Sequence, residues 1–426
     1  MYYSRLVITL VLVAMSLLSN AQKQINWYRV TADTTQLNYN PSNASNVIKM
    51  GYYNINPITG EEHRHQGNGV WVKDSLFGSY KQDASKPILI GNVAWVESWA
   101  QFISALSNPN IRSINLAANL TATSKAYIPA NQSVIKEIDG HGFEINIPAT
   151  IDTGFIRTYP SLAEANNGID QQLRFKNVSF KGGKTNVGMY VSANYGMSIE
   201  GCRFYNFATA LDLRWCMGTI INHCFFWENL IGVNLDFDRF AGGSNSTSQS
   251  NHSTVQNCKF RSRANGTANV RVFGASGVWI THNIFEGPNG GYDVFFDDNG
   301  SPNVKEVYMY GNHVEHQPTI AAFYIKLKDG YAYCGGIYSQ LDCNLISFES
   351  SGYAKCVVEN IPFLTSGTKF KSVGTGARWW FTNMPATFDP NTVTFWLGGV
   401  APTNSRYDNW NASGQSPFLQ LGTRRP

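Results

Sequence analysis

The most regular feature of the chain is a six-residue pattern of apolar and polar positions. Each copy has an apolar residue first, a small or polar residue third, Cys, Asn or Val fourth, and an apolar residue, usually Phe, sixth. Six segments carry the pattern: 175–180, 199–204, 221–226, 255–260, 280–285 and 309–314. Their fourth positions are Val178, Cys202, Cys224, Cys258, Asn283 and Asn312, at intervals of 24, 22, 34, 25 and 29 residues. Such a repeat predicts stacked units, with loops in the longer intervals.

A second alternating segment follows each copy of the pattern. These segments are 188–191, 210–214, 232–237, 269–272, 293–297 and 323–327. Alternation with a period of two predicts strands that turn one face toward a core. Three short strands with their turns need roughly 22–25 residues at ~3.3 Å per residue, whereas a propeller blade needs about 40. The pattern therefore predicts an all-β solenoid of stacked parallel coils.

The apolar period over residues 95–106 predicts a helix ahead of the first coil. An alternating strand follows at 111–116, and Ile138-Asp139-Gly140-His141-Gly142 comes after it. A helix here would cap the open apolar end and the unpaired strand edge of the stack. With the repeats, these features make residues 95 to about 385 resemble the right-handed parallel β-helix of the pectate-lyase-like superfamily. That superfamily includes lyases, hydrolases, adhesins and phage tail spikes, so the fold does not fix the function.

Four segments divide the chain: a leader at 1–21, a small β-hairpin module at 22–90, the β-helix at 91–385, and an aromatic-rich C-terminal cap or tail at 386–426. The module contains Gly51-Tyr52-Tyr53, Thr59-Gly60 and Asn68-Gly69-Val70-Trp71, and it resembles a hairpin module of phage tail fibres. A generic β-hairpin fits the same residues equally well.

The leader has the composition of an export signal. Arg5 precedes the apolar run Leu6–Leu18, and the small residues Ser19 and Ala21 predict cleavage before Gln22. The alternative is an uncleaved anchor, although a spanning helix needs about 20 apolar residues. We expect no stable membrane span after cleavage, and a secreted, extracellular protein or a component of a virion tail.

The charge and the cysteine content bear on the possible partners of the chain and on its disulfides. Charged residues make up 15% of the chain and the net charge is +4, a weak field that gives no reason to expect a nucleic-acid partner. The seven cysteines are an odd number. In register, Cys202, Cys224 and Cys258 would stack about 4.8 Å apart. We expect buried thiols that act as small apolar groups; a disulfide between adjacent coils stays open.

Stacking the second strand family places one set of polar side chains on an outer sheet. The residues predicted to face outward are Asp212, Arg214, Asn234, Asp236, Asp238, Arg271, Asp293, Phe295, Asp297, Tyr324 and Lys326. Carboxylates on neighbouring coils would lie about 5 Å apart, which suits a shared Ca²⁺. Carboxylates on alternate coils would lie about 10 Å apart, close to the spacing of an inverting glycosidase pair. The alternative is a solvated face on which mixed charges neutralise one another.

These outward residues would form a strip along the outer sheet. If the strip is an active site, Arg271, Asp236 and Asp297 are the predicted catalytic residues. Asp236 and Asp238 would bind calcium, and the predicted substrate-binding residues are Asp212, Arg214, Asn234, Asp238, Asp293, Tyr324 and Lys326. In the lyases that the fold resembles, acidic residues bind Ca²⁺, and Arg or Lys removes the proton beside a uronate carboxylate. The polygalacturonase motifs are missing from the chain.

Two classes of function remain. The first is an exported or virion-associated protein that engages cell-surface polysaccharide as a tail spike or adhesin, and the tail-spike resemblance implies a homotrimer. The second is a secreted polysaccharide lyase or glycoside hydrolase. The hairpin module and the missing motifs favour the first, and the leader favours the second.

Overall fold

The structure is a computed structural model that describes residues 92–129, 136–158, 173–238, 247–287, 290–301, 304–339, 343–361, 369–373, 377–382 and 384, and the backbone of strands at 29–30, 52–55, 62–67, 70–73 and 88–90. The predicted leader at 1–21 and the predicted C-terminal cap at 386–426 lie outside these residues. The chain divides into two units, Met1–Asn115 and Leu116–Pro426. Among the described residues, no helix combines the length and apolar character that a membrane span requires.

The first unit contains the predicted hairpins and the predicted helix. Strands β1 (Arg29–Val30), β2 (Tyr52–Ile55), β3 (Glu62–Gly67) and β4 (Val70–Lys73) form an antiparallel sheet. Strands β5 (Ile88–Ile90) and β6 (Val93–Val96) pair antiparallel, and β7 spans Ser113–Leu116. Helix α4 (Trp99–Ser107) starts after Ser98, whose side chain accepts a hydrogen bond from the Gln101 amide. The helix is therefore shorter than the apolar period suggested, because residues 95 and 96 belong to β6.

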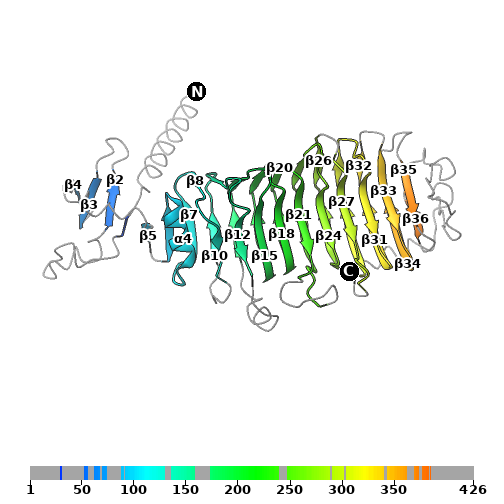
Figure 1. The fold of residues 1–426 in the computed structure, drawn as a ribbon, viewed down its shortest axis with the longest axis horizontal. Helices are drawn as coiled ribbons and strands as arrows, with labels where there is room; N and C mark the ends of the chain where they lie inside the picture. Colours follow the sequence, from blue (N-terminus) through cyan, green and yellow to red (C-terminus); the bar gives the residue numbers. More distant parts are fainter. Residues whose placement is uncertain are drawn as a thin grey trace, which may run out of the picture. The chain divides into compact units, whose positions relative to one another are not determined.

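The second unit is a parallel β-helix with three long sheets (Figure 1). The first sheet includes β10 (Lys136–Asp139), β13 (Leu173–Lys176), β16 (Ser198–Glu200), β19 (Ile220–Asn222), β22 (Thr254–Gln256), β25 (Val278–Thr281), β28 (Glu306–Tyr310), β31 (Asp329–Gly335), β34 (Tyr353–Glu359) and β36 (Arg378–Thr382). The second sheet contains β8 (Leu120–Thr121), β11 (Glu144–Asn146), β14 (Ser179–Lys181), β17 (Arg203–Tyr205), β20 (Phe225–Asn229), β23 (Lys259–Ser262), β26 (Ile284–Glu286), β29 (His313–Val314) and β32 (Tyr338–Ser339). The third sheet contains β9 (Ala126–Tyr127), β12 (Thr153–Arg157), β15 (Val187–Tyr195), β18 (Thr209–Met217), β21 (Ile231–Asp236), β24 (Ala268–Phe273), β27 (Tyr292–Asp297), β30 (Ala321–Lys326), β33 (Asn344–Glu349) and β35 (Lys369–Val373).

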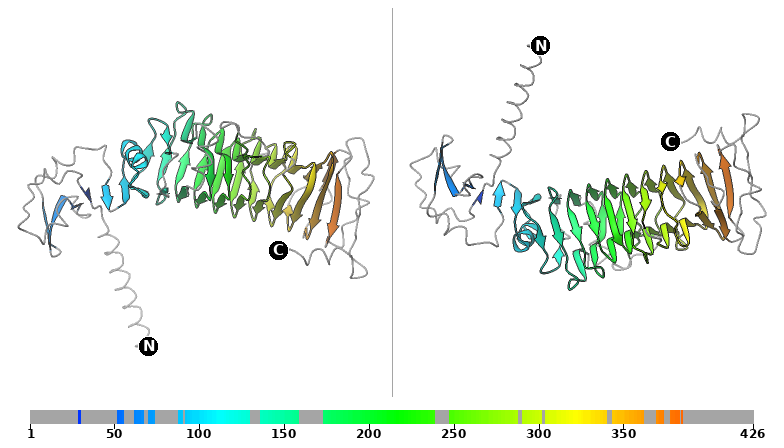
Figure 2. Two further views of the ribbon diagram at one scale, coloured as in Figure 1. Left: turned by 90° about the horizontal axis from the view of Figure 1, so that it is seen from below. Right: turned by 90° about the horizontal axis from the view of Figure 1, so that it is seen from above.

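The chain visits the three sheets in turn, so each coil pairs only with the coils on either side of it. The strands of each sheet lie side by side along the stack in all three ribbon views (Figures 1 and 2). The predicted solenoid of stacked parallel coils is confirmed. Its right-handed sense is the one that parallel crossover connections adopt.

The core contains the ladders that the repeat predicted. Phe180, Phe204, Phe226, Phe260 and Phe285 stack in order, with ring centroids 5.0, 5.1, 4.7 and 5.2 Å apart. The fourth-position residues form a second ladder in which backbone amides bond to the next side chain. Thus the Cys258 amide donates to Asn283 Oδ1 at 2.9 Å, and the Asn283 amide donates to Asn312 Oδ1 at 3.0 Å. All seven cysteines are buried free thiols, which confirms the expectation for Cys202, Cys224 and Cys258.

Candidate functional site

The outward side chains of the third sheet align in two columns. The strand register gives the first column as Tyr190, Asp212, Asn234, Arg271, Phe295, Tyr324, Ser347 and Lys371. The second column contains Ser192, Arg214 and Asp236, then Phe273, Asp297, Lys326, Glu349 and Val373. Asp236 and Phe273 directly follow the last residues that pair between their two strands, Leu235 and Val272. Residues far apart in the sequence therefore meet on one face.

The middle of this strip is a hydrogen-bonded network. The Asp212 carboxylate accepts two bonds of 3.1 Å from the Arg214 guanidinium and one of 2.7 Å from the Asn234 amide. Asn234 Oδ1 in turn accepts a bond of 2.9 Å from Arg271 Nε. Because Asn234 joins both partners, it couples Asp212 to the orientation of the Arg271 guanidinium.

The carboxylates at the end of β21 face away from the core but are covered. Asp236 is 4% exposed and Asp238 is fully buried. The Asp238 carboxylate accepts a hydrogen bond from the Ser192 hydroxyl, and the Ser250 hydroxyl donates to the Asp236 carbonyl at 2.8 Å. Ser250 thus ties the segment after β21 to the ends of these strands. The expectation of solvent-facing carboxylates was wrong here, because alternation shows which way a side chain points but not whether another segment lies over it.

The later part of the strip is half-exposed. Lys326 Nζ lies 3.6 Å from Asp297 Oδ2, and the Tyr324 hydroxyl lies 2.5 Å from Glu349 Oε2. The Tyr324 and Phe295 rings are stacked, with centroids 4.9 Å apart. Burial raises the pKa of Asp297, although the Asn299 amide and Lys326 oppose this effect. This end combines an ion pair with aromatic surface that a ligand could reach.

The two predicted catalytic carboxylates lie in one column, with an aromatic ring between them. Asp236 and Asp297 are two coils apart, about 10 Å by strand spacing, and Phe273 occupies the coil between them. The Arg271 guanidinium lies over the Phe273 ring, 4.6 Å from its centroid. Arg271 therefore sits between the two acidic coils, as predicted, and packs on the ring that separates the carboxylates.

Asp293 does not face outward, contrary to the prediction. Both Asp293 and Val294 are buried, so the regular alternation of β27 begins only at Val294. Asp293 Oδ1 lies 2.7 Å from His316 Nε2 and accepts a bond of 2.9 Å from the Asn269 amide. Burial raises the pKa of Asp293, and the hydrogen bond with His316 opposes the rise. Asp293 therefore belongs to a buried polar cluster inside the corner of the coil.

The predicted calcium site stays a prediction. Asp236 and Asp238 supply two carboxylates at the end of one strand, and oxygen ligands of this kind suit Ca²⁺. In the part of the chain that the structure describes, no three His, Cys, Asp or Glu side chains gather so that they could hold a metal ion. A calcium ion here would need backbone or hydroxyl oxygens as its further ligands.

Sequence reasoning missed an aromatic ladder on the outer face of the first sheet. Trp279, Tyr308 and Tyr333 stack along the solenoid, with centroids 3.9 and 5.1 Å apart. The Tyr308 hydroxyl donates to Glu306 at 2.7 Å. The signal was present in the sequence, because these rings occupy outward positions of equivalent strands, whereas the predicted site was confined to the second strand family.

Comparisons with known proteins found one matching family model and several similar structures. Residues 93–202 match a family described as a putative pectate lyase-like adhesive domain, and no curated protein matches the chain. The tailspike protein of Acinetobacter phage vB_ApiP_P1 is similar at a TM-score of 0.38 and 14% identity, over 83% of this chain and 69% of that one. The Streptococcus pneumoniae surface protein and adhesin PfbA is similar at a TM-score of 0.39 and 8% identity, over 72% of this chain and 95% of that one. L. reuteri 53608 SRRP is similar at a TM-score of 0.29 and 12% identity, over 74% of this chain and 96% of that one. At these identities the likeness concerns the fold alone.

Proposed function

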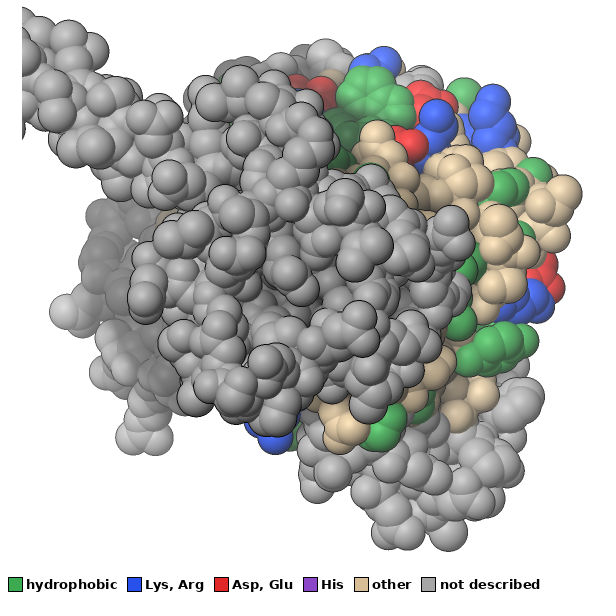
Figure 3. All heavy atoms as spheres, turned by 90° about the vertical axis from the view of Figure 1, so that its left-hand side faces the viewer, with side chains coloured by type: hydrophobic (Ala, Val, Ile, Leu, Met, Phe, Trp, Pro, Cys, Tyr) green, Lys and Arg blue, Asp and Glu red, His purple; other side chains and the backbone are tan. Residues whose placement is uncertain are grey.

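We propose that this chain is an exported or virion-associated adhesin or tail-spike protein that engages polysaccharide at a cell surface. The observation that carries the proposal is the match of residues 93–202 to an adhesive pectate lyase-like domain. The low content of charged residues, 15% of the chain, supports it, since a surface with few charges bonds mainly through amides, hydroxyls and aromatic rings. Among the described side chains visible in Figure 3, Lys or Arg lie close to Asp or Glu, with polar and apolar side chains between them, so neither charge sign dominates this described part.

The half-exposed end of the strip is the proposed contact surface on the third sheet. Tyr324 offers an aromatic face for a sugar ring, while Asp297 and Lys326 offer an acceptor and a donor for hydroxyls. Asp212, Arg214 and Asn234 would act indirectly, by fixing the Arg271 guanidinium. Buried Asp238 and Asp293 would support the neighbouring strands.

A polysaccharide array probed with the full-length chain tests this proposal. We expect the wild type to retain one class of surface polysaccharide and Tyr324→Ala to bind it at least about tenfold more weakly, since a lost stacking contact of about 1.4 kcal/mol has this effect. Tyr353→Ala is the matched control, because Tyr353 is a tyrosine of the first sheet that is 71% exposed. A wild type that retained no polysaccharide would contradict the proposal.

A second function, polysaccharide cleavage, is favoured by the placement of Asp236 and Asp297 two coils apart with Arg271 between them. In a lyase, Arg271 would remove the proton beside a uronate carboxylate and calcium at Asp236 and Asp238 would hold the substrate; in a hydrolase the two carboxylates would be the acid and base. Polyuronates incubated with Ca²⁺ and followed by ultraviolet absorbance of unsaturated ends test the lyase. New reducing ends test the hydrolase. If neither the wild type nor Arg271→Ala produced unsaturated ends or new reducing ends from any polysaccharide of the panel, both the lyase and the hydrolase would be contradicted.

Export and assembly belong to the same proposal. N-terminal sequencing of the secreted protein should start at Gln22 if the leader is cleaved. Light scattering of the full chain should give a trimer mass if the protein works as a tail spike. A monomer would favour the adhesin over the tail spike.

A further inference from the structure

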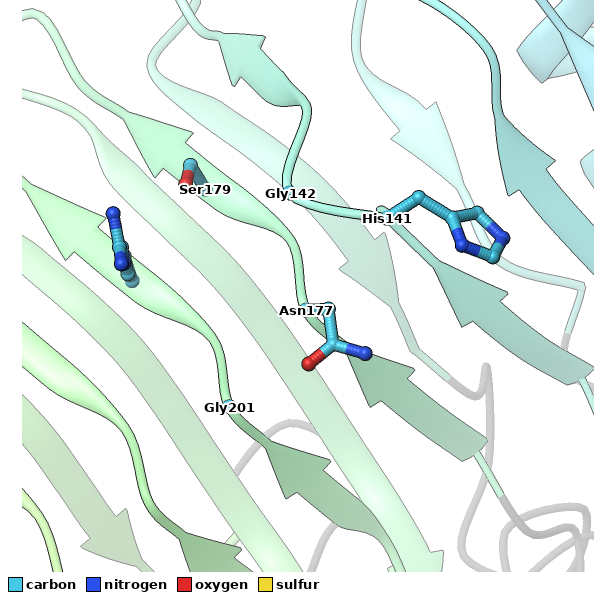
Figure 4. Close-up of a pocket in the computed structure, with 6 residues that line it drawn as sticks. His141, Gly142, Asn177, Ser179 and Gly201 are labelled. Carbon is cyan, nitrogen blue, oxygen red and sulfur yellow. The ribbon is translucent and has the colours of Figure 1, made fainter. Parts of the chain in front are cut away.

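A polar pocket lies on a different surface from the strip, where the first sheet turns into the second. It has a volume of about 320 Å³ and is lined by His141, Gly142, Asn177, Ser179, Gly201 and Arg203. Figure 4 shows His141, Asn177 and Gly201 in a row on successive coils, with Ser179 beside the row. All of these residues belong to the second unit.

The shape of the pocket follows from the turn between the two sheets. His141, Asn177 and Gly201 all have left-handed backbone conformations, with φ of 49°, 51° and 62°. Glycine at 201 lets the Asn177 side chain lie close over the backbone, since a Cβ there would come within 2.7 Å of Asn177 Oδ1. Space beside Gly142 is open, with no atom within 4 Å of an added Cβ. The open floor of the pocket is therefore the bare backbone at Gly142, while Asn177 covers Gly201.

Arg203 is the cation of this pocket, and the described part of the chain shows no hydrogen bond or ion pair of its exposed guanidinium. Two charged residues beside the pocket, Asp139 and Lys176, have partners. Asp139 accepts bonds from the His141 backbone amide at 3.0 Å and from Asn177 Nδ2 at 3.5 Å, and Lys176 pairs with Glu137 at 3.1 Å. An exposed guanidinium of this kind attracts an anion, and its planar set of N–H donors matches the two oxygens of a carboxylate.

Aromatic surface adjoins the cation. Arg203 lies in register beside Phe225 on the next coil. The Phe225 ring contacts Tyr205 edge-on at 6.1 Å and lies 5.4 Å from Trp227, whose ring is covered by Arg261 at 4.1 Å. Phe225 is half-buried, so part of its ring can pack against the apolar face of a sugar.

We infer that this pocket binds a sugar residue that carries a carboxylate. Arg203 pairs with the carboxylate, Asn177 and Ser179 bond to hydroxyls, and Phe225 packs against the ring. The inference rests on the proposed function, which says that the chain binds glycan, and adds the acidic class and a second location.

Calorimetry with the full-length chain tests the site. The probes are an oligogalacturonate, sialyllactose, and the same two sugars after their carboxylates have been reduced to alcohols. We expect one or both acidic probes to bind the wild type and to lose at least about tenfold in affinity on reduction, the value of a charge-assisted bond of about 1.4 kcal/mol or more. Arg203→Gln should cause the same loss.

Two further variants separate the pocket from general charge. Gly201→Asn should weaken binding while Arg203 stays in place, because its Cβ would displace the Asn177 side chain, in a backbone conformation that asparagine tolerates. Lys181→Ala removes an exposed cation of the adjoining coil and should leave binding within about twofold. Equal binding by wild type and Arg203→Gln, or by the acidic and reduced probes, would overturn the inference. If the array detects a neutral polysaccharide and neither acidic probe binds, the inference fails and the proposed function stands.

Discussion

The third position of each repeat has a backbone conformation that few side chains adopt. Asn177, Gly201, His223, Asn257, His282 and Gly311 all have positive φ, between 51° and 63°. A β-carbon is strained in this region, and Gly, Asn and His are the residues that tolerate it best. The small or polar residue in the sequence pattern is therefore a requirement of the turn between the first and second sheets.

Gly311→Ala tests this requirement. The new Cβ would meet left-handed strain at φ 63° and would also lie 2.7 Å from His282 Cδ2. We expect the free energy of unfolding to fall by about 2–4 kcal/mol, the sum of backbone strain and overpacking. Gly300→Ala is the control, since its φ is 70° and nothing lies within 4 Å of the added carbon. Urea denaturation should show a loss of only about 1–2 kcal/mol for the control. Equal losses would mean that the contact with His282 is unimportant.

Residue patterns predicted conformation better than they predicted environment. The fourth-position ladder follows from the repeat alone, because equivalent positions must align. Asp293 shows where this reasoning stops: it looked like part of an alternating strand, but it precedes the point where alternation begins. The partner that explains its burial, His316, follows a different strand, and nothing in the local pattern connects the two.

Among the elements, the stacked phenylalanines of the second sheet make the most regular contacts. Phe226 lies between Phe204 and Phe260, at 5.1 and 4.7 Å, and is 1% exposed. Phe226→Ala should lower the free energy of unfolding by about 3–5 kcal/mol, because a cavity would open between two rings that cannot close it. Phe225→Ala, one residue earlier on the outer face of the same strand, should cost less than half as much. A similar midpoint for both variants in urea denaturation would argue against the ladder as a source of stability.

Buried thiols of the strands predict a loss of stability in alkali. Burial raises the pKa of Cys216 from its ordinary 9.0 to about 12, so the thiol is neutral in the folded chain while the unfolded chain ionises near pH 9. The stabilising contribution is therefore complete below pH 9 and is lost as pH rises from 9 toward about 12. Each such thiol adds up to about 1.4 kcal/mol per pH unit to the decline. Urea denaturation between pH 8 and 11 should show a shallower decline for Cys216→Ala, and identical slopes would contradict this account.

The sequence showed which side chains of a strand point away from the core, but it did not show which of them are covered by another segment. Alternation correctly aligned Asp212, Asn234 and Arg271 in one column. It could not show that Asn234 bonds to both neighbours, or that Asp236 is covered, because both depend on side-chain conformations and on segments outside the repeat. The candidate strip was therefore predicted as a set of aligned residues, whereas its accessible part could be recognised only in three dimensions.

At the scale of the whole molecule, the stack makes each coil a separable unit. Contacts in the three sheets join adjacent coils, so stability is approximately a sum over coils and their interfaces. Residues 179–202 fill the interval of 24 between the equivalent positions Val178 and Cys202. Their deletion would place Phe155 beside Leu211, where Met189 stands now, and would bring Ile145 beside Phe204 and Phe175 beside Ile221. These three new pairs are apolar and in register, and Arg157 would lie beside Leu213 as it now lies beside Val191.

We therefore expect the chain lacking residues 179–202 to fold, with the far-ultraviolet circular dichroism of a β-rich protein and a cooperative thermal transition within about 10 °C of the wild type, the shift produced by a few kcal/mol in a large domain. Deletion of residues 179–190 removes about half a coil and is the control. It would set first-sheet strands against third-sheet strands, so apolar side chains would point outward and the ladders would break. If both deletions unfolded the protein to the same extent, stability would depend on contacts that span several coils, and the nearest-neighbour account of the solenoid would be wrong.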